Sequence, residues 1–560
     1  MGCGDSKSSI AKDNPKYKKT TQTNGIVAIN ANSKPNTNGT NNNSSNKLLK
    51  TPTNSSTIGG GLSPNKPVIG NKLIKSPRKS LMMEPKGVES IPILQVHLVE
   101  ERLNDAFEKD YEIINLIGSG SFGSVYKIKM RNTELIRALK IVKKEIVTFQ
   151  DDDQQFLKEI EILSQLDHPN ILKIYEFFFD GDNYYVITEF IEGGELLEQI
   201  YNIKNYCENS AAVIMAQVFS AVNYLHSNNI VHRDLKPENI ILQIKNDELD
   251  VKIIDFGTAN FNSKNSKFTI QYGTSYYLAP EILKNNYNNK CDIWSCGVIM
   301  YMILCGQPPF KGKDEDEILK SVERGVYSIK GNEWNVISKE AKDFINKLLS
   351  YNPKSRYAAN ECLSDPWIVN NLVNESVDYD LVLKNLRTFD STQKLQQFCV
   401  AYIIHQISSS DICSSLRDLF KKADKNREGR LKLKDLKDDI EKFYTIHEPG
   451  IKIDFNDIIN RFDHKNEDYL EYEEFLRATI DLELIITESN LQMAFFHFDK
   501  DKSGFISIDN LKKTLGIFFK EEEKEKEKEI VQKILSDAKL NVNGNISYQE
   551  FENFMKNSLK

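Results

Sequence analysis

The stretch that decides the fold is Val231-His232-Arg233-Asp234-Leu235-Lys236-Pro237-Glu238-Asn239, which follows a largely apolar run. Asp234 can accept a hydrogen bond from a hydroxyl group and orient it for attack on a phosphate. Lys236 can neutralise charge that develops on a phosphoryl group, and Asn239 offers a carbonyl oxygen of the kind that Mg²⁺ binds. The alternative is a solvated polar turn after a helix. The order of these residue types favours phosphoryl transfer over that alternative.

A glycine-rich segment upstream supplies a second part of such a site. It has the pattern G-x-G-x-x-G-x-V between two strand-like runs, and glycines let the backbone approach phosphates and donate its N–H groups to them. Lys140 follows at a spacing where its ammonium group can hold the α- and β-phosphates of ATP. Alone, the pattern is weak evidence, because glycine-rich turns are common. The residues expected to contact the nucleotide here are Ile117, Gly118, Ser119, Gly120, Ser121, Phe122, Gly123 and Val125.

Two further motifs complete the pattern. Asp255-Phe256-Gly257 follows an apolar strand-like run and adds a carboxylate for Mg²⁺, and Ala279-Pro280-Glu281 ends the segment after it. Together the motifs resemble those of Ser/Thr protein kinases of the calmodulin-dependent group over residues 111–368. The resemblance implies an α+β, two-lobed fold and an enzyme that transfers the γ-phosphate of ATP to Ser and Thr hydroxyls of protein substrates.

The same resemblance implies a role for each matching residue. Glu159 is the expected partner of Lys140, with Glu161 on another face of the same helix as the alternative. The implied catalytic residues are Asp234, Lys236, Lys140, Glu159 and Thr274. The implied Mg²⁺ ligands are Asn239 and Asp255, and the remaining implied ATP contacts are Ala138, Lys140, Glu189 and Ile191.

Glu195 follows the hinge-like run Tyr185–Ile191 and is expected to contact a bound ligand. In related kinases a glutamate at this place reads a basic residue upstream of the target Ser or Thr. The resemblance therefore implies a preference for basic substrates, and Lys236 is the residue found in Ser/Thr rather than Tyr kinases. The alternative for Glu195 is a solvated acid at the start of a helix.

Residues 369–410 carry the next resemblance. Leu383–Phe389 and Lys394–Ile404 combine basic and apolar residues at helical spacing and resemble the autoinhibitory junction of calcium-dependent protein kinases. The resemblance implies that this junction occludes the substrate cleft at rest and is gripped by a calmodulin-like domain when Ca²⁺ binds. The alternative is an ordinary packing helix after the kinase domain.

Four EF-hand-like units follow, as one pair over 411–480 and a second over 485–560, and each departs from the pattern D-x-[DN]-x-[DN]-G-x₅-E. The second and fourth loops place Lys465 and Lys539 where an oxygen ligand belongs, and an ammonium group repels Ca²⁺. The third loop ends in Asn510, which cannot supply a carboxylate. The better Ca²⁺ ligands are Asp424, Asn426, Glu428 and Asp435 in the first loop and Asp499, Asp501 and Ser503 in the third.

The eighth position of every loop is nevertheless apolar. This pattern predicts an intact all-α, calmodulin-like domain of two paired EF-hand lobes even where metal binding fails. The residues concerned are Leu431, Leu470, Ile506 and Ile546.

Residues 1–93 are rich in Asn, Ser, Thr, Lys and Gly and predict a disordered tail, because they cannot bury enough apolar area to form a core. Their start fits the N-myristoylation pattern at Gly2, and Cys3 beside it is a candidate for palmitoylation. Two acyl chains would give stable anchoring, so we expect the cytoplasmic face of a membrane, with a cytosolic fraction. The alternative is a tail that begins Met-Gly by chance.

Composition limits the remaining classes. A net charge of −7 does not suggest nucleic-acid binding, and the cysteines show no disulfide or metal-ligand spacing, which fits a reducing, intracellular compartment. We expect a monomer with an intramolecular contact between junction and EF-hands. Two alternatives stay open. The first is a Ca²⁺-insensitive Ser/Thr kinase whose EF-hand domain is a scaffold. The second is a membrane-tethered Ca²⁺-binding protein with an inert kinase lobe.

Overall fold

The computed structural model describes most of the chain beyond residue 98. The described residues are 99–101, 107–120, 123–145, 153–203, 206–245, 248–261, 268, 273–372, 394–447, 469–514 and 545–557. The predicted tail with Gly2 and Cys3, and the first half of the predicted junction, lie outside the described residues.

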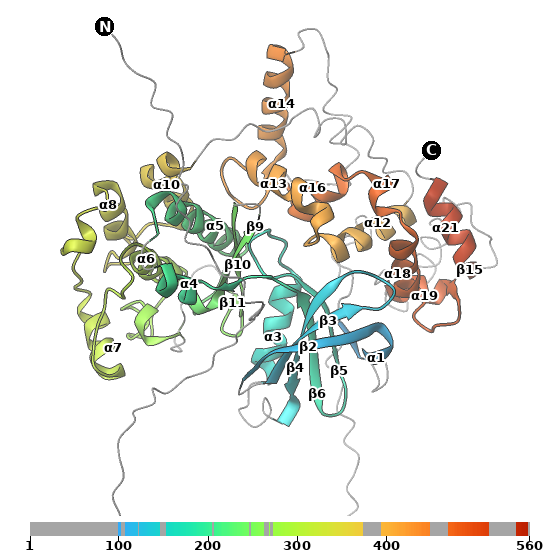
Figure 1. The fold of residues 1–560 in the computed structure, drawn as a ribbon, viewed down its shortest axis with the longest axis horizontal. Coiled ribbons are helices and arrows are strands. Elements are labelled where there is room, and N and C mark those ends of the chain that lie inside the picture. Colours follow the sequence, from blue (N-terminus) through green and yellow to red (C-terminus); the bar gives the residue numbers. More distant parts are fainter. Residues whose placement is uncertain are drawn as a thin grey trace, which may run out of the picture.

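The N-terminal lobe is built on one six-stranded sheet with the order β1-β5-β6-β4-β3-β2 (Figure 1). Apolar side chains on one face of the sheet form a small core that includes Tyr111, Leu139 and Phe178, and the Phe178 ring stacks on Tyr185 with 4.9 Å between centroids. The elements are β1 (Val99–Glu101), α1 (Phe107–Asp110), β2 (Tyr111–Gly120), β3 (Gly123–Met130), β4 (Ile136–Lys143), α3 (Asp153–Ser164), β5 (Ile174–Phe179) and β6 (Asn183–Glu189).

The C-terminal lobe is mainly helical, and its central helix α6 (Lys290–Cys305) is buried from Cys291 to Cys305. Burying each large apolar side chain stabilises the lobe by roughly 1.5–3 kcal/mol. Around α6 lie α4 (Leu196–Ile203), α5 (Glu208–Ser227), α7 (Glu315–Arg324), α8 (Lys339–Leu348), α9 (Ala359–Leu363) and α10 (Pro366–Asn371). This lobe also has two small sheets, β10-β9-β7 and β11-β8. Their strands are β7 (Gly194–Glu195), β8 (Ile230–Val231), β9 (Ile240–Lys245), β10 (Glu248–Ile253) and β11 (Asn260–Phe261).

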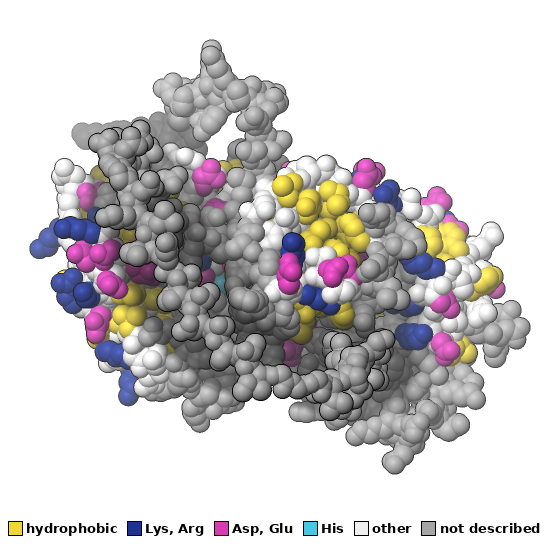
Figure 2. All heavy atoms as spheres, turned by 90° about the horizontal axis from the view of Figure 1, so that it is seen from below, with side chains coloured by type: hydrophobic (Ala, Val, Ile, Leu, Met, Phe, Trp, Pro, Cys, Tyr) yellow, Lys and Arg dark blue, Asp and Glu magenta, His cyan; other side chains and the backbone are white. Residues whose placement is uncertain are grey.

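Local sequence explains where these helices begin and end. Asp314 caps α7 by accepting a hydrogen bond from the Glu317 N–H, and Ser338 caps α8 in the same way through Ala341. Gly325 ends α7 in the left-handed conformation, which glycine adopts at little cost. In the view of Figure 2, acidic and basic side chains are interspersed over the described surface of this lobe.

The EF-hand module confirms the predicted paired architecture. Leu431 of β12 pairs with Leu470 of β13, and Ile506 of β14 pairs with Ile546 of β15, so each pair of loops is joined through its apolar eighth positions. All four side chains are buried. The strands are β12 (Leu431–Lys432), β13 (Tyr469–Leu470), β14 (Phe505–Ser507) and β15 (Asn545–Ser547). The helices are α13 (Ser414–Ala423), α14 (Leu433–His447), α16 (Tyr472–Thr479), α17 (Leu482–Ile485), α18 (Glu488–Phe498), α19 (Ile508–Thr514) and α21 (Tyr548–Lys556).

The second half of the predicted junction forms helix α12 (Lys394–Ile407). It packs against α16 and α18, and its apolar side chains share one core with both EF-hand pairs. Met130 and Leu135 of the N-terminal lobe pack against this core, so the module lies beside that lobe (Figure 1).

Two further properties concern the described residues as a set. Their seven cysteines are all free thiols, and every one except Cys207 is buried, as is common for free cysteines, which pack as small apolar residues. Within the described ranges, no helix has the length and apolar character needed to cross a membrane.

Candidate active site

One buried carboxylate supports the loop Val231–Asn239, which contains the candidate catalytic residues. Asp292, at the start of α6, accepts hydrogen bonds from the backbone N–H groups of His232 (3.0 Å) and Arg233 (2.9 Å). His226 contacts the same carboxylate at 2.8 Å. Burial opposes ionisation, but these contacts hold the pKa of Asp292 below its usual value. These contacts hold the backbone of the loop at His232 and Arg233.

The polar side chains of the loop converge on Asp234. One oxygen of its carboxylate accepts from the Thr274 N–H at 3.0 Å and from the Thr274 hydroxyl at 3.1 Å. The other accepts from the Lys236 ammonium at 2.6 Å, and Lys236 also contacts the Thr274 hydroxyl at 3.0 Å. Asp234, Lys236 and Thr274, predicted from separate motifs, therefore form one cluster.

Lys140 and Glu159 meet on the N-terminal side of the cleft, with 4.0 Å between Nζ and the carboxylate. Burial, assisted by the nearby Asp255, raises the pKa of Glu159 against the opposing effect of Lys140. Glu159 is buried while Glu161 is only half-buried, so the structure places the first choice, and not the alternative, beside Lys140.

Two side chains fit a bound Mg²⁺. Asn239 donates its amide N–H to the Asp234 backbone carbonyl at 2.9 Å, which leaves its carbonyl oxygen as the end that can bind a cation. Asp255 has a positive φ of 62°, and its carboxylate accepts from the Gly257 N–H at 3.2 Å. Both are hard oxygen donors of the kind that Mg²⁺ prefers.

The glycine-rich segment forms a hairpin between β2 and β3. Gly118 pairs with Val125, Ser119 with Ser124 and Gly120 with Gly123, whereas Ser121 and Phe122 lie outside the described residues. At Gly123 a Cβ atom would lie 1.9 Å from the Ile141 carbonyl oxygen, so only glycine fits there.

The remaining predicted ATP contacts line the same region. Ala138 and Val125 are buried and Ile117 is half-buried. Ala138 pairs with Thr188, just before Glu189, across neighbouring strands. Glu189 ends β6, and Ile191 follows it in the connection to the C-terminal lobe.

Acidic side chains gather on the C-terminal side of the cleft. Burial first, and then repulsion from Glu238 and Glu198, raises the pKa of Glu195 to about 7. Within the described part of the chain, one buried carboxylate oxygen of Glu195 and one of Glu238 lack a hydrogen-bond partner. Sequence reasoning missed Glu238 and Glu198. Glu238 stands beside Asn239 in the quoted stretch, and that neighbourhood was the available signal.

The first EF-hand loop surrounds a cavity of about 260 Å³. Asp424 accepts from the Glu428 N–H (3.0 Å) and the Gly429 N–H (2.7 Å), and Asp435 accepts from Asn426 at 3.4 Å. The Lys432 ammonium group forms an ion pair with the Glu428 carboxylate at 3.2 Å. All four candidate ligands line this cavity, although a Ca²⁺ ion would compete with a neighbouring ammonium group.

The third loop is organised around Asp499, which accepts from the Ser503 N–H at 3.0 Å and the Gly504 N–H at 2.8 Å. Asp501 also accepts from the Ser503 N–H, at 3.4 Å. Asn510, at the twelfth position, instead accepts from the Ser507 hydroxyl at 2.6 Å. Within the described ranges, no three His, Cys, Asp or Glu side chains are grouped to hold a metal by themselves, so Ca²⁺ would also need amide, hydroxyl or backbone oxygens.

Comparison with known proteins agrees with this geometry. The family model described as "Protein kinase domain" matches residues 111–368, and the model described as "EF-hand domain pair" matches residues 488–556. Calcium-dependent protein kinase 4 of Plasmodium falciparum (isolate 3D7) is 38% identical over 466 residues, which cover 81% of this chain and 87% of the relative. Calcium-dependent protein kinase 5 of the same organism is 35% identical over 457 residues, or 81% and 79%. The chain therefore belongs to the calcium-dependent protein kinase family.

Proposed function

We propose that this Ser/Thr protein kinase transfers the γ-phosphate of ATP to protein substrates with basic residues near the target, under control of Ca²⁺ at its EF-hands. The observation that carries the catalytic part is the Asp234 carboxylate held by Thr274 and Lys236. The complete set of catalytic groups argues against the alternative of an inert kinase lobe.

The chain's own residues divide the reaction among them. Asp234 orients the substrate hydroxyl by accepting its hydrogen bond, and Lys236 stands ready to stabilise charge on the transferred group. Lys140, positioned by Glu159, holds the α- and β-phosphates. Asn239 and Asp255 would hold Mg²⁺, and the ion would supply positive charge to neutralise the phosphates.

The test is Asp234→Asn, which keeps the side-chain shape and removes the charge that orients the hydroxyl. We expect kcat to fall about 100-fold or more, with ATP affinity and thermal unfolding unchanged. A variant that retained wild-type turnover would show that Asp234 does not have this role.

The acidic group on the C-terminal side supports the basic-substrate proposal. Partly buried carboxylates with unpartnered oxygens are sites where a substrate Arg or Lys can supply the missing donor. Peptide libraries around a Ser or Thr should therefore be enriched in basic residues upstream of the target.

The proposal that Ca²⁺ controls the kinase has one alternative, a kinase that does not respond to Ca²⁺. We propose that the junction covers the substrate cleft at rest and that Ca²⁺ in the first and third loops favours its grip by the EF-hand module. The similarity to calcium-dependent protein kinases supports this calcium control. The competitor is a kinase whose EF-hands are a fixed scaffold, and it rests on the Lys432–Glu428 contact and the orientation of Asn510. Phosphotransfer measured with Ca²⁺ and with chelator separates them, because equal activity in both would eliminate calcium control.

We further propose that acylation at Gly2 and Cys3 brings the enzyme to the cytoplasmic face of a membrane. The support is the sequence pattern at the N-terminus. Cell fractionation of wild type and Gly2→Ala is the test, and an unchanged membrane fraction would overturn the proposal.

A further inference from the structure

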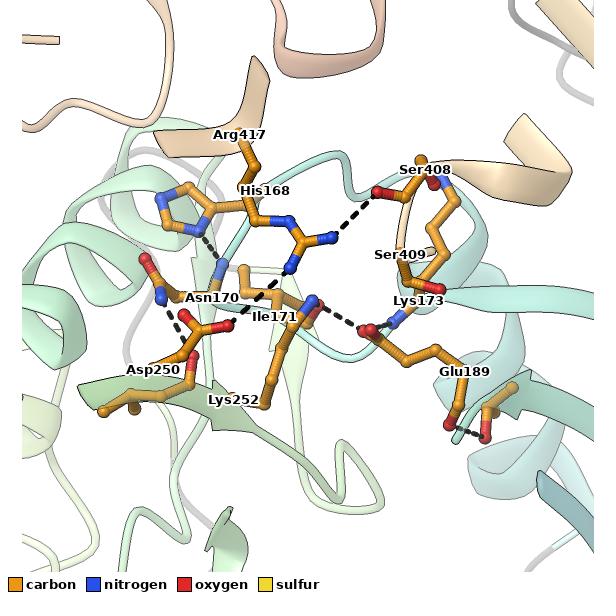
Figure 3. A network of polar contacts seen from close by, with 12 residues as sticks. His168, Asn170, Ile171, Lys173, Glu189, Asp250, Lys252, Ser408, Ser409 and Arg417 are labelled. Carbon is orange, nitrogen blue, oxygen red and sulfur yellow. Dashed lines mark hydrogen bonds and ion pairs between the residues drawn. The ribbon is translucent and has the colours of Figure 1, made fainter. Parts of the chain in front are cut away.

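The EF-hand module contacts the kinase domain through ion pairs between partly or fully buried side chains. Figure 3 shows one of them, between Arg417 and Asp250. Lys173, just before β5, pairs with Glu473 of α16 at 2.7 Å, and the exposed fractions of the two side chains are only 14% and 3%. Asp250 of β10 pairs with Lys421 of α13 at 2.6 Å and lies 3.9 Å from Arg417. Two helices of the module thus meet two separate sites on the kinase.

Lys173 contacts the module with its side chain and the hinge with its backbone. Its N–H donates to the Glu189 carboxylate at 2.8 Å, and its carbonyl accepts from the Glu189 N–H at 2.9 Å. Glu189 ends β6, the strand that leads into the hinge, and is buried. Its carboxylate also accepts from Lys252 at 2.7 Å. The conformation of the hinge strand is therefore tied to the position of Lys173.

The module adds a second contact at the same end of the sheet. Arg137 lies opposite Glu189 in neighbouring strands and donates to the Gln406 carbonyl near the end of α12. Its guanidinium stacks on the Tyr175 ring at 3.8 Å. A cation that hydrogen-bonds the last carbonyls of a helix stabilises that end.

The charge on Glu473 depends on its partners. Burial would raise the pKa of this carboxyl, but Lys173 and His405 hold it well below its usual value. Removing one member of a buried ion pair leaves the other charge uncompensated. Moving the Lys173 side chain away from Glu473 is therefore unfavourable. In the loop of this same EF-hand, Lys465 stands where an oxygen ligand belongs. Helix α16, which follows that loop, nevertheless contacts the kinase domain.

We propose that Lys173 is a positioning residue for ATP: Glu473 fixes it from the EF-hand side, and it fixes the hinge through Glu189. The proposal deepens the proposed function and rests on it for the identity of the nucleotide. Docking of the EF-hand module then determines the affinity for ATP, whereas the cluster at Asp234 determines the rate of phosphoryl transfer.

The test uses the full chain with Ca²⁺ present and compares wild type with Glu473→Gln, which preserves shape but removes the charge. We expect the KM for ATP to rise about five-fold or more, with kcat at saturating ATP and the KM for peptide within about two-fold of wild type. The dissociation constant of ATP, measured by calorimetry, should rise by the same factor. A merely structural role would lower kcat and thermal stability without this selective change.

A second variant and a control keep the result interpretable. Lys173→Met should match Glu473→Gln, and the double variant should add little to either, because both remove one interaction. Glu134→Gln breaks the exposed Lys129–Glu134 pair in the same lobe and should leave ATP binding unchanged. If both interface variants bind ATP as wild type does, the proposal is wrong. If wild type binds ATP but transfers no phosphate, the proposed function fails while the ATP-binding comparison still decides the role of Lys173.

Discussion

Glu195 is a residue whose charge changes within the physiological range, since burial and its acidic neighbours raise its pKa to about 7. Below that pH the carboxyl is mostly neutral, and above it the carboxylate can attract a substrate cation. We expect the ratio of kcat/KM for a basic peptide to that for a neutral peptide to rise several-fold between pH 6 and pH 8. Steady-state assays with the two peptides at each pH measure it.

The matched variant for this prediction is Glu195→Gln, which removes the titrating group and keeps its size. Its peptide-preference ratio should be low and nearly independent of pH. A wild-type ratio that stays flat over the same range would contradict the assigned role of Glu195.

Gly429 and Gly504 occupy the same position in the first and third EF-hand loops, with φ of 75° and 81°. A Cβ at Gly429 would lie 2.1 Å from His168 of the kinase domain, whereas nothing lies within 4 Å at Gly504. Gly504→Ala should cost about 1 kcal/mol from backbone strain alone. Gly429→Ala should cost about 2–4 kcal/mol because the ring must also move. Thermal unfolding of both variants is the measurement. Equal losses of stability would mean that the EF-hand module does not contact the kinase domain at His168.

At the scale of elements, the N-terminus of α16 brings several carboxyl groups to the kinase surface. Asp167 accepts from the Glu473 N–H at 2.7 Å. The Glu473 side chain is buried and that of Asp167 is half-buried. Burial and repulsion from Glu473 raise the pKa of Asp167 to about 7. Ionisation of Asp167 thus opposes the folded arrangement, and stability falls as pH rises from about 4 to about 7. The opposite contribution, from the lowered pKa of Glu473, is complete above about pH 5.

Asp167→Asn separates this effect from the hydrogen bond, because the amide oxygen can still accept from the Glu473 N–H. We expect the midpoint of thermal unfolding to fall less between pH 5 and pH 8 in this variant than in wild type. Parallel pH profiles for the two proteins would show that Asp167 does not titrate in this range.

Much of the element structure could be predicted from local patterns. The helix around Glu159 follows from its apolar spacing, and the paired strands of the EF-hands follow from one apolar residue in each loop. The catalytic cluster could also be predicted, because its residues lie in short motifs whose chemistry is specific. Glu238 stands beside Asn239 in the motif, but its role depends on its proximity to Glu195, which the linear sequence does not reveal.

At the scale of the whole molecule, the contacts between the kinase domain and the EF-hand module were beyond sequence reasoning. Lys173 and Glu473 stand 300 positions apart (473 − 173), and each looks like an ordinary surface charge in its own segment. Only the arrangement of α12, α13 and α16 against the hinge makes them partners. The junction was predicted as a helix, and its position beside the N-terminal lobe required the structure.

The reciprocal hydrogen bonds between Lys173 and Glu189 have a consequence for inhibitor discovery. Compounds that compete with ATP commonly bind the backbone of the hinge, so their potency depends on how that strand is held. A catalytic fragment limited to residues 111–368 keeps Lys173 but lacks Glu473 and Gln406. Screening against such a fragment would rank compounds by their binding to a hinge that lacks its contacts with the EF-hand module. The full chain is the appropriate target for measuring selectivity.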